Sequence, residues 1–157
     1  MNKSLGIPEW HKMALEGNAP PVRIPLNGNS MFPLIRWNKD YVTIIPLDRK
    51  VVVGDIVLIA EPISERYVMH RVWEIRDNQV LTWGDNCWKQ DAWVPIDTIW
   101  GRAVLIERGR REIHTDPKKG MRWAKFWHKA GRTYNMFVGY WNGAVRRIKK
   151  LFARGTK

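Results

Sequence analysis

Cysteine and long apolar runs are scarce in this chain, and so are acidic residues near its end. The 157 residues include one cysteine, Cys87, which excludes a disulfide within the chain and is consistent with a reducing compartment. No uninterrupted apolar stretch approaches the roughly 20 residues that span a bilayer, and residues 1–19 lack the apolar core of a signal peptide. We therefore expect a protein that is cytoplasmic or peripheral at the cytoplasmic membrane, with no signal peptide and no transmembrane helix.

Acidic side chains are missing from only one part of the chain. Residues 1–117 contain 15 basic and 15 acidic side chains, whereas residues 118–157 contain 12 basic and no acidic ones. The net charge of +12 therefore comes from the last part alone, which predicts two parts with different tasks. We expect an N-terminal extension over residues 1–21, a β-domain over 22–112 and a basic amphipathic helical tail over 113–157.

Short strands and turns dominate the first 112 residues. β-branched and aromatic runs bounded by turn residues are typical of strands, and Asp77-Asn78 suits the tight turn of a hairpin. A short helix is expected around residues 8–16. It must end before Pro20-Pro21, which cannot continue a helix. The predicted fold class is mainly β, with strands near 22–26, 41–45, 56–60, 66–76, 79–83 and 99–107.

The tail follows a different periodicity. Asp116 can cap a helix and Pro117 suits its first turn, so a helix is predicted to begin there. From Trp123 onward, apolar residues recur at spacings of three and four, and lysine and arginine fall largely between them. This pattern predicts an amphipathic helix, in which interior glycines would allow a break into two helices.

Three polar segments could together supply acyl-transfer chemistry. Ser30 lies in a turn bounded by glycine and proline, and a serine hydroxyl needs an adjacent base to become a nucleophile. His70 could be that base, and either Asp85 or Asp91 could fix its tautomer. Taken singly, each has an ordinary structural explanation: a turn serine, a half-buried histidine, a turn aspartate and a solvated loop acid.

The serine turn also offers backbone donors. The N–H groups of Gly28, Asn29 and Ser30 could hold an oxyanion, and a glycine at position 28 would let a substrate carbonyl approach closely. No cofactor is predicted, and no metal site, because the four histidines lack ligand-type spacing. Cys87 has no sequence neighbour that would activate its thiol, so the sequence favours no chemical role for it.

Four motifs stand in an order that is typical of a known superfamily. They are Gly28-Asn29-Ser30-Met31-Phe32-Pro33, Gly54-Asp55-Ile56-Val57, His70-Arg71-Val72, and Gly84-Asp85-Asn86 followed by Asp91. The chain resembles the signal peptidase I and LexA-like serine peptidases over roughly residues 22–106. At position 70 it resembles the endoplasmic-reticulum type, because His70 stands where bacterial members mostly have lysine. The helical extension resembles that of small peptidases of this superfamily in gut Bacteroidetes.

The resemblance implies a signal-peptidase-like catalytic β-domain. In it Ser30 is the nucleophile, His70 the general base and Asp91 the third member, while Asp85 shapes the turn or is a second candidate for orienting His70. The implied function is a serine endopeptidase that cleaves a signal, leader or membrane-proximal peptide through an acyl-enzyme. The alternative is a non-catalytic module on a peptidase-like scaffold that binds a membrane or nucleic acid. A LexA-like self-cleaving regulator would need a DNA-binding domain, for which the residues before the core are too few.

The basic tail is a candidate substitute for the N-terminal anchor of the family, which is not evident here. Aromatic residues combined with lysine and arginine favour an anionic membrane surface. The residues expected to bind it are Trp123, Lys125, Trp127, Lys129, Trp141, Arg146 and Arg147. Two explanations stay open beside this one: the helix could pack on the β-domain, or it could bind nucleic acid, although no recognised nucleic-acid motif frames it.

Overall fold

The structure is a computed structural model that describes residues 6–60 and 67–131. The chain divides into two compact units, Met1–Trp123 and Ala124–Lys157. Most of the described residues belong to the first unit, which is mainly β, as the sequence predicts.

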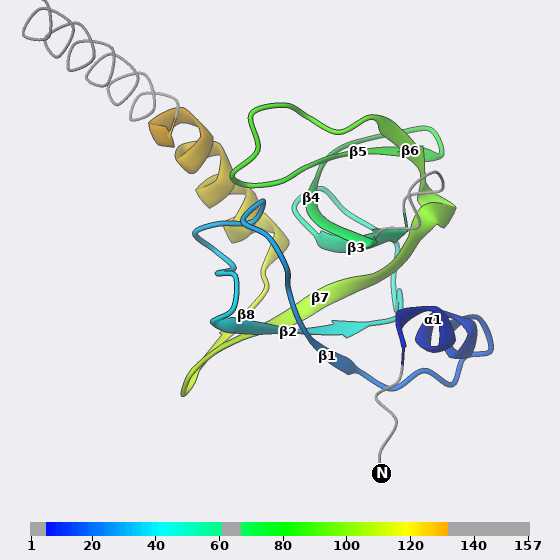
Figure 1. Ribbon diagram of the computed structural model, residues 1–157. Coiled ribbons are helices and arrows are strands. Elements are labelled where there is room, and N and C mark those ends of the chain that lie inside the picture. The colour runs from blue at the N-terminus through cyan, green and yellow to red at the C-terminus, as the bar shows by residue number, and fades with distance from the viewer. Residues whose placement is uncertain (1–5, 61–66, 132–157) are drawn as a thin grey trace, which may run out of the picture. The chain divides into compact units, whose positions relative to one another are not determined.

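Within the described residues, eight strands form one antiparallel sheet. They are β1 (Val22–Pro25), β2 (Asp40–Ile45), β3 (Ile56–Ala60), β4 (Tyr67–Arg76), β5 (Gln79–Trp83), β6 (Trp93–Pro95), β7 (Ile99–Arg108) and β8 (Arg111–His114). The order along the sheet is β1-β2-β7-β3-β4-β5-β6, and β8 also pairs with β7. The long strand β7 pairs with β2 on one edge and with β3 and then β8 on the other, so it joins the two halves of the sheet (Figure 1).

The six strands predicted from the sequence are confirmed, and the hairpin turn carries Asp77 at a positive φ of 49°. Two short strands were not predicted. β6 has three residues and β8 is the polar segment Arg-Glu-Ile-His, so neither shows an apolar alternation. Pairing with β5 makes β6 a strand and pairing with β7 makes β8 one, and β8 carries the sheet two residues past the predicted boundary at 112.

The core lies on both faces of the sheet. In β3, Ile56 and Leu58 belong to one cluster, with Val42, Ile44, Met69 and Ile106, whereas Val57 and Ile59 belong to a second, with Val72, Val80 and Ile99. Successive side chains of a strand point to opposite faces, so a strand covered on both sides must be apolar throughout. This explains the unbroken apolar run of β3.

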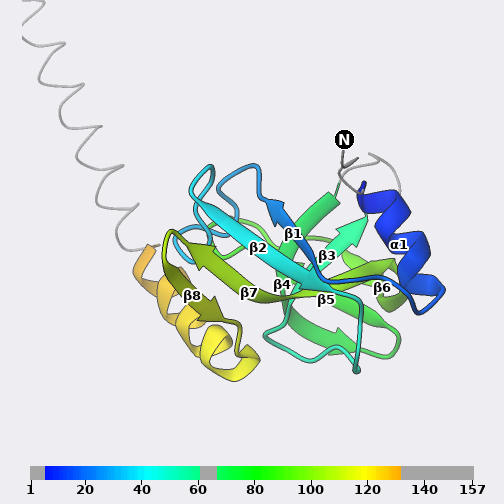
Figure 2. The ribbon, with the colours of Figure 1, turned by 90° about the horizontal axis from the view of Figure 1, so that it is seen from below.

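The predicted N-terminal helix is confirmed as α1 (Ile7–Leu15). Trp10 is fully buried in the first core cluster and donates its indole N–H to the carbonyl of Pro20 at 2.7 Å. His11 stacks on Trp100 at the start of β7, with ring centroids 3.9 Å apart. Figure 2 shows α1 at one end of the sheet. The helix is therefore part of the core and packs against β7; the short helix η1 (Ile96–Thr98) directly precedes that strand.

The predicted start of the C-terminal helix is also confirmed. The helix covers residues 117–131 of the described chain, and the side chain of Asp116 accepts the N–H of Lys119 at 2.9 Å. Among the residues expected to bind a membrane, Trp123, Lys125 and Lys129 are exposed, while Trp127 is partly buried. Trp141, Arg146 and Arg147 lie outside the described residues. None of the helices in residues 6–60 and 67–131 has the length and hydropathy of a membrane span.

Candidate active site

His70 and Asp91 are brought together across the sheet. His70 lies in β4, and Asp91 ends the loop that follows β5, the strand paired with β4. The imidazole Nδ1 lies 2.6 Å from Asp91 Oδ2, a distance typical of a charge-assisted hydrogen bond. The Nδ1–H therefore points at the carboxylate, and Nε2 is left for the chemistry of the site.

Thr82 holds the Asp91 carboxylate in place. Its hydroxyl donates to the same oxygen, Oδ2, at 2.7 Å, and its carbonyl accepts the N–H of Asp91 at 3.0 Å. Thr82 is buried near the end of β5. No sequence motif marks this residue, because a threonine in a strand is ordinary until the loop folds back onto it.

Asp85 has a different partner. Arg71 donates two hydrogen bonds to it, from Nε to Oδ1 at 2.9 Å and from Nη2 to Oδ2 at 2.7 Å. Both side chains are almost fully buried. The remaining nitrogen, Nη1, donates to the carbonyl of Gly54 in the second motif at 3.0 Å. The acid in contact with His70 is thus Asp91, while Asp85 ties its loop to β4 and to the Gly54 turn.

Asn86 fastens the serine turn to the same loop. Its backbone N–H donates to the carbonyl of Ser30 at 2.7 Å, and its side-chain amide donates to the carbonyl of Asn29 at 3.2 Å. A further bond inside the turn, from the N–H of Phe32 to the carbonyl of Asn29, measures 3.1 Å. Asn86 stands in the fourth motif but was not predicted as a site residue. Its role becomes visible only when the two loops meet.

Gly84 lies where the three segments converge. A Cβ at this position would lie 2.7 Å from Cys87 Sγ, 2.8 Å from the carbonyl oxygen of Ser30 and 2.9 Å from His70 Nε2. Such distances leave no room for any side chain, so the backbone itself must pass between them. The serine turn, the imidazole and the Cys87 loop therefore form one packed unit.

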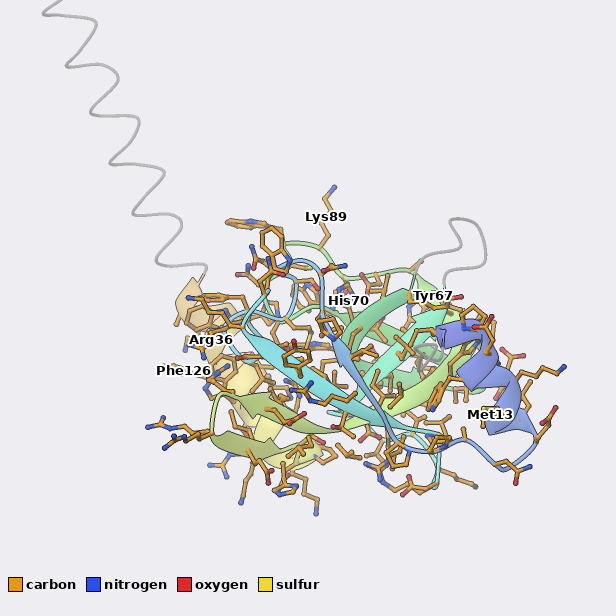
Figure 3. All side chains as sticks on the ribbon, turned by 60° about the horizontal axis from the view of Figure 1, so that its bottom comes forward. Met13, Arg36, Tyr67, His70, Lys89 and Phe126 are labelled. Carbon is orange, nitrogen blue, oxygen red and sulfur yellow. The ribbon has the colours of Figure 1, made fainter. Side chains whose placement is uncertain are left out.

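Ser30, His70 and Cys87 line the same cavity. Its volume is about 780 Å³, within the usual size of a ligand pocket, and most of its other walls are apolar, including Ile24, Leu58 and Met69. A second hollow of about 620 Å³ shares Ser30 and Cys87 and continues along residues 86–91. Figure 3 shows Lys89 extending outward from this loop, whereas His70 lies deeper among the strands.

The predicted oxyanion donors are not used by the protein itself. Within the described residues, no hydrogen bond employs the N–H groups of Gly28, Asn29 or Ser30. Gly28 has a φ of +99°, which favours glycine, and nothing lies within 4 Å of the place where its Cβ would stand. The hydrogen bonds of the described residues include none from the Ser30 hydroxyl to His70, a contact that often tightens only when substrate is bound.

The charge state of His70 is set by its neighbours. Burial lowers the pKa of the imidazole, but the interactions with Asp91 and Cys87 outweigh it and raise the pKa to about 9. Because Nδ1 is bound to Asp91, the sulfur of Cys87 faces Nε2. The sequence around Cys87 gives no sign of this interaction, because Cys87 lies in a loop and His70 is 17 residues away in β4.

No group of three or more His, Cys, Asp or Glu side chains suited to a metal ion occurs in residues 6–60 and 67–131.

Comparison with known proteins finds no matching family model and no match among curated proteins. The chemistry of the site therefore has to be argued from its own geometry.

Proposed function

We propose that this chain is a serine endopeptidase of the signal-peptidase-like type. One observation carries the proposal: Asp91 binds His70 Nδ1, while Nε2 lies beside Gly84 near the carbonyl oxygen of Ser30, and Ser30 and His70 line the same cavity. A nucleophile, a base and an orienting acid in this relation form the triad logic of acyl transfer. The unused N–H groups of the serine turn add the donors that such chemistry needs.

In the proposed reaction, Ser30 Oγ attacks the carbonyl carbon of a peptide bond while His70 Nε2 takes the hydroxyl proton. Asp91 stabilises the imidazolium, and the N–H groups of the turn stabilise the oxyanion. The C–N bond then breaks as His70 returns the proton to the leaving amine. Water, deprotonated by His70, hydrolyses the acyl-enzyme. The apolar cavity walls suit a segment with apolar side chains, such as a signal or leader peptide.

Cleavage of signal-peptide-like and leader-peptide substrates by wild type and by Ser30→Ala tests the proposal. We expect Ser30→Ala to reduce turnover by at least about 10³-fold, because the nucleophile is lost. Thr98→Ala is a matched control, since it removes an exposed hydroxyl that donates to the carbonyl of Pro95, away from the Ser30 turn. Equal turnover by wild type and Ser30→Ala would refute the serine mechanism and leave a binding module on this scaffold as the better explanation.

We also propose that the basic tail, residues 118–157, binds an anionic membrane surface. Lys125, Phe126 and Lys129 are exposed on the described part of its helix, a combination that suits the interface of a bilayer. Each basic side chain near an anionic leaflet is worth about 1 kcal/mol. Sedimentation with anionic and with neutral vesicles checks this. A full-length chain carrying Lys125→Glu and Lys129→Glu should bind more weakly than one carrying Arg110→Glu and Arg111→Glu.

A further inference from the structure

Cys87 occupies a chemically unusual position for the one cysteine of the chain. Its sulfur and His70 Nε2 lie 2.7 and 2.9 Å from the same point beside Gly84, and the interaction with Cys87 helps to raise the pKa of the imidazole. The other nitrogen of His70 is held by Asp91 at 2.6 Å. Thiol, imidazole and carboxylate therefore stand in the order nucleophile, base and orienting acid, which is also the order of thiol-dependent enzymes.

The loop around Cys87 is fixed rather than loosely placed. The N–H of Cys87 donates to the carbonyl of Gly84 at 3.0 Å, and the carbonyl of Cys87 accepts the indole N–H of Trp83 at 2.9 Å. Asn86, the preceding residue, is bonded to the serine turn. These bonds hold the backbone of Cys87 in place beside Gly84 and His70.

The sulfur is also reachable. Cys87 is only partly buried, and it lines both the apolar cavity and the hollow along residues 86–91. Trp88 beside it is 70 % exposed, so the loop borders solvent. A small molecule that enters either space can meet the thiol, a condition that buried structural cysteines do not satisfy.

We propose that Cys87 is a modification site, a thiol activated by His70 that reacts with small disulfides and alkylating electrophiles. The Cys87 sulfur reacts as the thiolate, paired with the protonated imidazole of His70, and attacks one sulfur of a small disulfide. A new S–S bond forms at Cys87, the old S–S bond breaks, and the released thiolate takes the proton from His70 or from water. The cysteine is oxidised and the small disulfide is reduced, so electrons and atoms balance.

A mixed disulfide at Cys87 would occupy the cavity that Ser30 and His70 line and would remove the sulfur from the imidazole. This consequence rests on the proposed peptidase function: thiol modification would switch cleavage off, and a reducing thiol would restore it. The reactivity of Cys87 itself does not depend on that function, because it is measured without any peptide.

Intact-mass measurement of alkylation by iodoacetamide tests the reactivity, since the full chain has one cysteine. At pH 6.5 an ordinary thiol is only about 1 % thiolate. We expect folded wild type to react at least about tenfold faster than the same chain in urea, after both rates are scaled to free glutathione in the same solution. His70→Gln should lose this advantage and Asp91→Asn should lose part of it, whereas the exposed His114→Gln should keep it.

A folded chain that reacts no faster than the unfolded one, or a His70→Gln variant that keeps the full rate, would overturn the proposal. Circular dichroism verifies that each variant folds, and Asp91→Asn carries the test if His70→Gln does not. Oxidised glutathione supplies the second arm: the expected result is one glutathione adduct, loss of peptide cleavage and recovery with dithiothreitol. Cleavage that persists in the adduct would contradict the switch alone, and absence of cleavage in untreated wild type would contradict the peptidase proposal alone.

Discussion

Two neighbouring residues of β4, His70 and Arg71, each pair with an aspartate of the loop that follows β5, and the two pairs differ in their exposure to solvent. Arg71 and Asp85 are nearly inaccessible, with side-chain exposures of 1 % and 0 %, and each of the three guanidinium nitrogens donates a hydrogen bond inside the protein. His70 and Asp91 are more open, at 8 % and 33 %, and one nitrogen of His70 faces a cavity. The first pair binds the loop to the sheet, and the second holds a reactive group at the loop's edge.

The difference shows that adjacent residues of one strand can have separate roles, one anchoring a loop and the other holding a titratable group in a cavity. Side chains next to each other on a strand point to opposite faces. One face of β4 at this point meets the turn of Gly54, where the bidentate Arg71–Asp85 ion pair is buried. The other meets the cavity, where a titratable imidazole is useful. Anchoring by Arg71 and Asp85 therefore sets the position that the His70–Asp91 pair requires.

Asp91→Asn should give the largest effect, and it should fall on activity. An amide cannot hold the imidazole in the same tautomer or stabilise its positive charge, so we expect cleavage to fall by about 10⁴-fold. The free energy of unfolding should change much less, because Asp91 is one-third exposed. Peptide cleavage and urea unfolding measure the two. A decrease in the free energy of unfolding large enough to explain the loss of cleavage would contradict the prediction that Asp91 serves activity rather than stability.

Asp85→Ala should damage stability instead. It leaves the Arg71 guanidinium buried without its acid, which typically costs about 3–5 kcal/mol. The double variant Arg71→Met/Asp85→Leu should recover most of that loss, since no charge stays buried. Asp48→Ala is the control: its partner Arg102 forms a pair at the surface, worth less than about 1 kcal/mol. Urea unfolding that ranks Asp48→Ala with Asp85→Ala would contradict this difference.

The pH dependence should come from the His70 pair. The pKa of His70 is raised from 6.5 to about 9 in the folded chain, so the proton stabilises the fold fully below pH 6.5. As the pH rises through 9 this contribution is lost, and the free energy of unfolding should fall by up to about 3 kcal/mol. Asp91→Asn should flatten the slope, whereas Asp97→Asn, an exposed acid, should not.

The loss of the His70 proton that lowers stability at high pH should increase the rate of cleavage. A general base must be neutral, so kcat/KM should increase with pH up to about 9. A peptidase whose rate is already at its plateau at pH 7 would show that His70 has lost its proton there.

Asn86→Ala should have the smallest effect. The substitution removes the hydrogen bond from the side-chain amide to the carbonyl of Asn29 but keeps the hydrogen bond from the backbone N–H to the carbonyl of Ser30. We expect a loss of about 1 kcal/mol or less in stability and a modest decrease in kcat with little change in KM. A large change in KM would indicate that Asn86 contacts the substrate rather than positions the serine turn.

Patterns along the chain were enough for the long elements. α1, the hairpin of β4 and β5, and the helix start at Asp116 follow from local signals: turn residues, apolar periodicity and a capping side chain. β6 and β8 do not, because an edge strand is created by the neighbour with which it pairs. The Arg71–Asp85 pair needed the fold as well, since nothing local separates Asp85 from Asp91.

The sequence by itself determined a mainly β chain with Ser30, His70 and Asp91 in four ordered motifs, and it placed all the excess charge in the tail. Residue identity, periodicity and charge are local properties, so they can be read without coordinates. The tertiary structure alone decided which acid meets His70, that Thr82 and Asn86 fix the two loops, and that Cys87 shares the imidazole. Those contacts join residues distant in sequence, and the sheet pairing brings them within reach.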